Sequence, residues 1–595
     1  MDNYKYQTTE NANKKLETVP EKDFQVNLIS NSITENTNML DIENNSNNYF
    51  SYSNKNTNFF LKHVYLYFYY GGYKGYLSEK IKKIINKTFT LFFSSYLLLM
   101  INWKSLFNNE DFIYLVPTIQ NPIYYFVLIY FIIYSFQLII YLLSNLKDFF
   151  YIKKVKNLYQ NKLKLNDTQL FGIKWNEITN KIVELHNTNT NNHKLYNYEG
   201  QLSSYIINHN ISRINNYMIM LINHNILKTR MGCLIFTSTY ITKDIEWFIK
   251  NIFVYNSFTF NNRLNYEYVR SINKISIYFK IFGIFYVFFL PFKLIYYIFT
   301  FVFNHAEDIK SKRKDTDISK FGWTNHAKWT FREYNELDHI FNKRLQASYI
   351  YADMYKQQYY KPLTNSINSC IIFICKAFLS VIILITVIDD ELLLNMNIMN
   401  KNLLWYIAFF SFIISFSKIG TSNPESLIYS PEKIMKNIAI YTHYMPDVWK
   451  KNCNKLFVRE QFNKLYISKI KMFLYDIYYI LLSPIIYFFI IPNCAKQVFD
   501  CIQDSTEQLN GVGDVCSYSN IEKSLSNNIL GDYRQKATNS YINYKTHNPN
   551  WDEDTNNKII EDIEKKPIKE KELKDFFLHH STNNKMDYYL WKLNE

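Results

Sequence analysis

Six blocks of apolar residues, separated by polar and charged stretches, dominate the chain between residues 88 and 491. Because a helix rises about 1.5 Å per residue, about 20 apolar residues cross the ~30 Å hydrocarbon layer of a bilayer. The second block meets that length in full. The pattern therefore predicts an all-α polytopic membrane protein. The blocks are Thr88–Trp103, Pro122–Leu146, Ile275–Phe303, Ile371–Ile388, Leu403–Phe416 and Met472–Ile491.

The charges beside the blocks predict which of them cross the membrane, because Lys and Arg in short loops favour the cytosolic side. Lysines precede the first block and follow the second, which places both flanks in the cytosol. The loop 104–121 between them has one Lys and two acidic residues, and the loop 389–402 is acidic. Both loops are expected to be lumenal. The first, second, fourth and fifth blocks are thus predicted to be four transmembrane helices.

The two remaining blocks, Ile275–Phe303 and Met472–Ile491, have basic residues on both sides and a proline near the middle. Pro291 and Pro484 each remove a helix hydrogen bond, and an interrupted helix at membrane depth needs protein or a water-lined cavity around it. We interpret both blocks as re-entrant helical hairpins that enter and leave on the cytosolic face. The alternative is two kinked helices that cross completely.

The remaining segments are predicted to be cytosolic and mainly helical, with both termini in the cytosol. The Asn-rich head cannot bury enough apolar surface to offset its chain entropy and is expected to be disordered. The predicted order is a head (1–55), spans one and two (56–150), a helical region (151–274), the first hairpin (275–304), linker helices (305–366), spans three and four (367–419), further helices (420–471), the second hairpin (472–492), a helical region (493–551) and a charged tail (552–595).

The composition and motifs speak against an enzyme. The net charge is +15, the seven Cys are an odd number, and 12 Gly and 12 Pro are few for 595 residues, which favours helix. No H-E-x-x-H or C-x-x-C pair offers a metal scaffold, and no Walker, kinase or G-x-S-x-G motif occurs. The sequence GVGD (511–514) is interpreted as a tight turn rather than a nucleotide loop. No cofactor, metal or nucleic acid is expected.

Two groups of polar residues are candidates for a route through the membrane. Ser411, Ser415 and Lys418 share one face of the fourth predicted span, and a polar stripe in lipid should face protein or water. The alternative is that the serines bond their own helix carbonyls and Lys418 extends to the interface. Lys310 and Lys312 follow the first hairpin. They could contact lipid headgroups or merely anchor the segment in the cytosol.

Several long motifs resemble the autophagy-related protein 9 family. They are ISRINNYMIMLIN (211–223), FREYNELDHIFNKRLQASYIYADMY (331–355), THYMPDVWKKN (442–452), LLSPI (481–485), GVGDVCSYS (511–519) and NPNW (548–551). The resemblance covers about Tyr49 to Trp551. Asn335, Glu336 and Arg344 are predicted to tie helices or subunits together. The motif residues carried over as structural are Arg332, Asn335, Glu336, His339, Arg344, His443, Pro446, Asp447, Trp449, Gly511, Gly513 and Asp514.

The resemblance implies a homotrimer with interleaved subunits and an ATP-independent phospholipid scramblase activity. It implies residence in Golgi- and endosome-derived vesicles and the preautophagosomal membrane, beside a bridge-like lipid transfer protein and other autophagy factors. The family's charged pore cluster falls on residues 310–312, where only Lys310 keeps a basic residue of animal members, and Ser415 takes the place of a pore-facing Thr. The alternative function is a vesicle scaffold without lipid transport. The lipid-path candidates are Lys310, Lys312, Ser411, Ser415 and Lys418.

Overall fold

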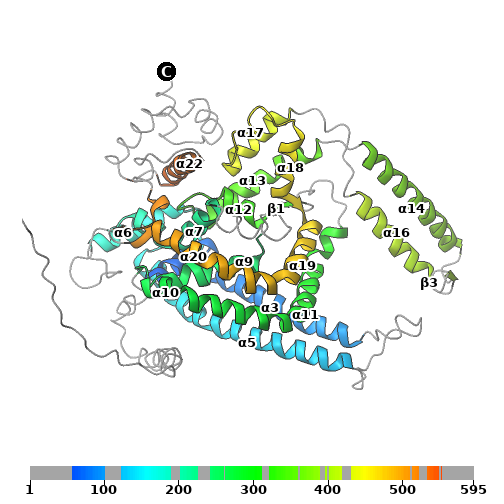
Figure 1. Cartoon of the computed structure of the whole chain (residues 1–595), viewed down its shortest axis with the longest axis horizontal. Helices are drawn as coiled ribbons and strands as arrows, with labels where there is room; N and C mark the ends of the chain where they lie inside the picture. The colour runs from blue at the N-terminus through cyan, green and yellow to red at the C-terminus, as the bar shows by residue number, and fades with distance from the viewer. Residues whose placement is uncertain are drawn as a thin grey trace, which may run out of the picture.

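Three long helices run side by side along one edge of the molecule in the computed structural model (Figure 1). They are α3 (Tyr73–Met100), α5 (Pro122–Asn157) and α11 (Ile272–Lys310). The structure describes residues 57–100, 122–188, 202–224, 241–259, 262–310, 321–358, 362–388, 396–398, 401–418, 430–509, 512–520, 532–548 and 551. The predicted head (1–55) and tail (552–595) lie outside these residues.

The N-terminal helices form one buried cluster beside the C-terminal end of α5. Helix α2 (Thr57–Tyr69) packs along α5, and Tyr67 stacks on Tyr159 with ring centroids 4.5 Å apart. Trp175 and Ile178, which lie on one face of the next long helix, join this cluster. The short elements after α5 are η3 (Leu158–Lys162), η4 (Gln169–Phe171) and α6 (Trp175–Thr188).

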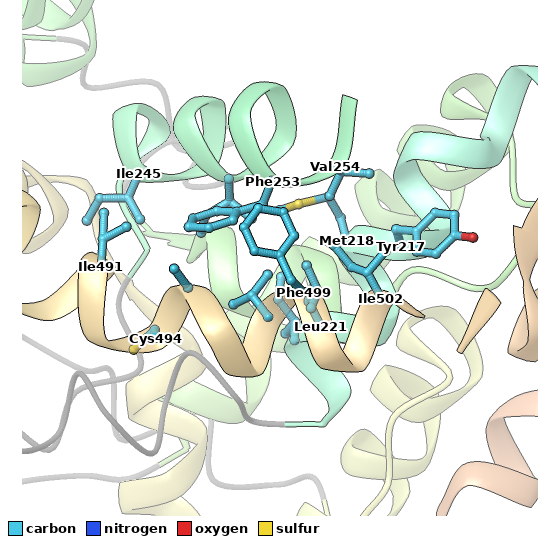
Figure 2. Packing of buried hydrophobic residues seen from close by; sticks show 14 of the residues in the cluster. Tyr217, Met218, Leu221, Ile245, Phe253, Val254, Ile491, Cys494, Phe499 and Ile502 are labelled. Atoms are coloured by element: carbon cyan, nitrogen blue, oxygen red, sulfur yellow. The ribbon is translucent and has the colours of Figure 1, made fainter. Parts of the chain in front are cut away.

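A second core forms where five helical segments meet around α7 (Ser204–Asn223) (Figure 2). Ser203 caps α7 by accepting a hydrogen bond from the Ile206 amide at 3.3 Å, and nearly every side chain of this helix is buried. Around it pack α9 (Lys243–Phe248), η5 (Ile249–Val254), α11 and α20 (Ile491–Asp504). Helix α20 contributes Val498, Phe499 and Ile502, the spacing of one helix face. The chain between η5 and α11 forms η6 (Tyr255–Ser257) and α10 (Tyr266–Arg270).

A third core joins the segments on either side of the helices α14 and α16. It combines α12 (Asn325–Phe331), α13 (Asp338–Gln357), α17 (Pro431–Thr442) and α18 (Leu456–Leu465). An antiparallel pair of short strands, β1 (Phe321–Trp323) and β4 (Tyr466–Ser468), closes this unit, with Trp323 opposite Tyr466.

Helices α14 (Pro362–Ile388) and α16 (Leu403–Lys418) form an antiparallel pair that lies to one side of the other helices (Figure 1). The strands β2 (Asn397–Ile398) and β3 (Lys401–Asn402) connect them. Many of their apolar side chains are exposed, among them Phe373, Val387 and Phe412. The last described elements are the hairpin β5 (Thr506–Leu509) and β6 (Gly513–Cys516), then η10 (Ser517–Ser519) and α22 (Asp532–His547).

Four described helical segments are long and apolar enough to cross a membrane: Tyr124–Lys162, Ile272–Asn304, Asn365–Ile388 and Lys469–Asp504. Two of them contain the second and third predicted spans. The first predicted span lies at the end of α3 and extends beyond its last described residue. The fourth is α16, whose 16 residues rise only about 24 Å. The other two long segments are the predicted hairpins.

Neither Pro291 nor Pro484 ends its helix, so no break is observed at these prolines, and the re-entrant course of the two segments stays a prediction. Helix α11 continues through Pro291 for 39 residues. The second segment continues from α19 (Lys469–Ile485) through the π-helical turn η9 (Ile486–Ile490) into α20. Figure 1 shows α19 and α20 pointing in different directions, so the chain bends there. A proline removes a single intrahelical bond, and the π-helical turn after Pro484 absorbs the misfit as a bend rather than a break.

Candidate functional site

The lipid-path candidates lie on two separate parts of the fold. Helix α11 ends at Lys310, whose side chain is not described, and Lys312 lies outside the described residues. The other three candidates lie on α16, where the helix confirms the predicted spacing. Ser411 is exposed; the side chains of Ser415 and Lys418 are not described. Ser417, which the sequence reading did not select, is buried. The α14–α16 pair, which carries the serine candidates, lies apart from α11 (Figure 1).

The FREYNEL motif forms a buried ion pair between Glu336 and Arg344. Arg344 Nε and Nη2 donate to the two carboxylate oxygens of Glu336 at 3.0 and 2.8 Å. The same guanidinium donates to the carbonyls of Phe331 at 2.9 Å and Tyr441 at 2.6 Å, so it joins α12, α13 and α17. Burial would raise the pKa of Glu336, but the charge and hydrogen bonds of Arg344 lower it below its ordinary value. This pair stays charged and links three helices.

Asn335 adopts a left-handed conformation, with φ at 58°, and connects the motif to α7. Its amide and side chain exchange hydrogen bonds with the side chain of Asn216 at 2.9 and 2.8 Å. Its Nδ2 also lies 3.1 Å from His209 Nε2 and donates to the Ser519 carbonyl at 2.8 Å. Burial, together with the charge of Arg213, lowers the pKa of His209 to about 3. His209 is therefore neutral at physiological pH.

Glu333, the third residue of the FREYNEL motif, is the centre of a second buried charge cluster. Ser540 Oγ of α22 donates to Glu333 Oε2 at 2.8 Å, and His443 Nδ1 lies 3.3 Å from Glu333 Oε1. Burial raises the pKa of Glu333 against the opposing charges of Lys536 and Arg344, and burial lowers the pKa of Lys536 to about 8. His443 closes α17 in a left-handed conformation, with φ at 53°.

The flanking residues of the motif make further contacts between distant segments. Arg332 forms an ion pair with Asp338 and donates to the Glu336 carbonyl at 3.1 Å. His339 Nδ1 lies 3.0 Å from the Tyr65 hydroxyl of α2, and burial lowers the pKa of this imidazole to about 4. These contacts bring the N-terminal helices against the motif.

The HYMPDVW segment builds the turn between α17 and α18. The Trp449 amide donates to the Pro446 carbonyl at 2.8 Å, and its buried indole donates to Gln461 Oε1 at 2.6 Å. Asp447 is largely exposed and pairs with Lys450 at 2.8 Å. Trp449 is part of the third core, and Tyr444 and Met445 pack against it.

The GVGD sequence makes the β5–β6 turn, as predicted, with Gly511 outside the described residues. Gly513 has a φ of 92°, and a Cβ there would lie 2.7 Å from the Asn262 carbonyl oxygen. Asp514 Oδ2 accepts a hydrogen bond from the Leu264 amide at 2.7 Å. The residues therefore fasten the hairpin to the segment before α10 and show no phosphate-binding arrangement.

The sequence reading missed the partners that complete these clusters. Asn216 and His209 lie within the mainly apolar α7, and Lys536 lies in a polar segment whose burial nothing local indicates. Polar residues inside a buried helix were the available signal for the first two, since such groups need hydrogen-bond partners. Among the described residues, no three His, Cys, Asp or Glu side chains are grouped as a metal site would require.

Comparison with known proteins identifies the family. The model of the family described as "Autophagy protein ATG9" matches residues 52–522, which is most of the chain. The chain belongs to the Atg9 family. Autophagy-related protein 9 of Dictyostelium discoideum is 27% identical over 539 residues, 85% of this chain and 74% of that protein. The Schizosaccharomyces pombe relative is 29% identical over 491 residues, covering 78% and 67%.

A solved Atg9 structure has the same fold. The cryo-EM structure of Schizosaccharomyces pombe Atg9 superposes with a TM-score of 0.56 at 26% identity, over 78% of this chain and 98% of that chain. The Saccharomyces cerevisiae relative is 27% identical over 478 residues, which are 78% of this chain but 47% of that protein. The motifs that indicated the Atg9 family in the sequence were therefore sufficient to identify it.

Proposed function

We propose that this member of the Atg9 family is an ATP-independent phospholipid scramblase that equilibrates lipids between bilayer leaflets as autophagosome membranes expand. The observation that carries the proposal is the family match over residues 52–522 together with four long apolar helical segments. The proposed sites of action are Golgi- and endosome-derived vesicles and the preautophagosomal membrane, with a bridge-like lipid transfer protein as the expected source of lipid.

The long apolar segments Ile272–Asn304 and Lys469–Asp504 are proposed to enter the membrane from the cytosolic side and return to it. Both ends of the 469–504 segment join the same helical body: β4 pairs with β1, and α20 packs on α7. Helix α11 likewise begins beside α10 and is followed along the chain by β1. Ends that share one folded body lie on one side of a bilayer, so a bend is sufficient and no hairpin turn is needed.

A homotrimer is proposed because the lipid-path candidates are divided between two parts of each chain. The α14–α16 pair exposes a long apolar surface and stands apart from α11 (Figure 1). If this pair packs against a second copy, the polar residues of α16 in one chain approach the lysines that end or follow α11 in another. The residues concerned are Ser411, Ser415 and Lys418 in the first chain and Lys310 and Lys312 in the second. A hydrated path of this kind lowers the cost of moving a charged headgroup through hydrocarbon, which is several kcal/mol or more.

The competing function is a vesicle scaffold that recruits autophagy factors through its cytosolic surface. Large buried networks in the cytosolic cores, such as Glu336–Arg344, are compatible with either function. The two functions differ in one measurable property, which is whether lipid changes leaflet.

The test is the exchange of a fluorescent phospholipid between leaflets in liposomes that hold equal numbers of trimers. Ser415→Trp adds bulk to the path and Lys310→Leu removes a charge from it, so each is expected to slow exchange by tenfold or more, since about 1.4 kcal/mol is tenfold in rate. Ser78→Trp, at an exposed position of α3 outside the α14–α16 pair, is the control for added bulk. Wild-type exchange no faster than in empty liposomes would support the scaffold instead. Rapid exchange by both variants would reject these path residues.

A further inference from the structure

An ion pair within the long apolar helices is not part of the path described above. Lys293 Nζ of α11 lies 2.7 Å from Asp244 Oδ2 of α9. Lys293 is the only Lys or Arg between Ile281 and Asn304, and its neighbours Phe288 and Phe289 are exposed apolar side chains. Charged residues in such a segment are costly and mark functional sites by default.

The pair is accessible from outside the chain. The Lys293 side chain is 29% exposed and the Asp244 side chain 37% exposed. Both can therefore exchange their mutual contact for contacts with a third molecule. The next residue, Ile245, is fully buried against Ile491 in the core of Figure 2, so Asp244 is held in place by its own helix.

Two tyrosine hydroxyls lie behind the ion pair. The Lys293 ammonium lies 5.2 Å from the ring centroid of Tyr286, and the rings of Tyr286 and Tyr487 are 5.4 Å apart. Tyr487 is completely buried and Tyr286 is 5% exposed. The Tyr286 hydroxyl interacts with the side chains of Lys293 and Ser483, whereas the Tyr487 hydroxyl has no hydrogen-bond partner among the described residues. A buried hydroxyl without a partner costs free energy, and a ligand oxygen would satisfy it.

We propose that Asp244, Lys293 and the hydroxyls of Tyr286 and Tyr487 form a binding site for the headgroup of a zwitterionic phospholipid. The lipid phosphate binds Lys293 and the tyrosine hydroxyls, and the ammonium group binds Asp244. Because the headgroup carries one charge of each sign, it can replace the protein ion pair without leaving either residue unpaired. The exposed aromatic side chains of α11 beside the pair provide an apolar surface for the acyl chains. This proposal rests on the scramblase function and names a further step on its route.

The proposed site should bind zwitterionic and anionic phospholipids differently. Photoactivatable phosphatidylcholine and phosphatidylglycerol probes carry the same phosphate, but only the first has a cationic group. In liposomes containing the full chain, Asp244→Asn should lower labelling near Lys293 by phosphatidylcholine at least threefold and leave labelling by phosphatidylglycerol unchanged or higher. Lys293→Met should lower labelling by both probes. Lys280→Met, which removes an exposed lysine of the same helix, should change neither.

Tyr487→Phe separates binding from folding. Removing a buried hydroxyl without a partner should leave the unfolding temperature equal or higher, while a headgroup site should lose about threefold in labelling. Labelling equal to wild type in Tyr487→Phe, Asp244→Asn and Lys293→Met would overturn the site. Leaflet exchange is measured on the same liposomes. If wild type exchanges lipid and the three substitutions leave labelling unchanged, the site is rejected and the scramblase function is not. If labelling depends on the ion pair but wild type does not exchange lipid, the scramblase function is rejected and the site is not.

Discussion

Glu336 and Arg344 show how one ion pair can stabilise the helical body around the FREYNEL motif. Both side chains are buried and the carboxylate accepts two hydrogen bonds from the guanidinium. Glu336→Gln leaves the Arg344 charge buried without a counter-charge, which typically costs about 3–5 kcal/mol. We expect a clear fall in the unfolding temperature in detergent and loss of trimers before loss of lipid exchange per remaining trimer. The exposed pair Asp447–Lys450 is the control, and Asp447→Asn should cost less than about 1 kcal/mol.

The low pKa of His209 is expected to make the free energy of unfolding depend on pH. Its folded pKa of about 3 lies below the unfolded value of 6.5, so between these values only the unfolded state takes up the proton. Stability is therefore lost as the pH falls from 6.5 towards 4, by at most about 1.4 kcal/mol per pH unit from this group. His209→Gln removes this contribution, so the stability of wild type relative to the variant should decline over that range in thermal unfolding scans. A constant difference would contradict the assignment.

At the residue scale, the sequence predicted which motifs matter but not their partners. Asn335 hydrogen-bonds to α7 and Glu336 to Arg344 in the structure, while the predicted role of these residues as links between helices or subunits stays a prediction. Glu333 interacts with Lys536 and Ser540, which lie 203 and 207 positions later in the sequence. Such pairing depends on the tertiary fold and cannot be predicted from the local sequence pattern.

At the scale of elements, the contact between α11 and η9 depends on Gly283. A Cβ at this position would lie 3.0 Å from both the Phe488 amide nitrogen and the Pro484 carbonyl oxygen. Gly283→Ile should force the two helices apart and cost about 1–3 kcal/mol, measured as a lower unfolding temperature. At Gly172 the nearest atom to a Cβ is 3.9 Å away, so Gly172→Ala should be tolerated. An unchanged unfolding temperature for Gly283→Ile would show that the contact is not close in the membrane.

The lengths of the apolar runs predicted most of the membrane helices, but the positions of the prolines did not predict whether a helix breaks or continues. The blocks at 122–146 and 371–388 correspond to long helices, because the apolar run alone determines them. Pro291 and Pro484 suggested turns, yet the chain stays helical through both. Whether a proline breaks or bends a helix depends on packing from neighbours such as α19 on α11, which a single sequence does not contain.

At the scale of the whole molecule, the topology can be tested by glycosylation in cells. Asp317→Asn creates the sequon Asn-Ile-Ser between α11 and β1. The two-sided attachment of α11 to the cytosolic body predicts that this site stays unmodified. Glu110→Thr creates Asn-Asn-Thr in the loop 104–121, which is predicted to be lumenal and should accept a glycan. Modification at residue 317 would mean that α11 crosses the membrane completely.

The most direct measurement of the central claim is the rate of leaflet exchange in both directions, without nucleotide, in liposomes containing the purified chain. A passive route through a protein-lined path lowers the same barrier for inward and outward movement. We predict equal inward and outward rates for a fluorescent phospholipid, far above those of empty liposomes, with no change on addition of ATP. Exchange at the rate of empty liposomes, or movement in one direction only, would contradict the account.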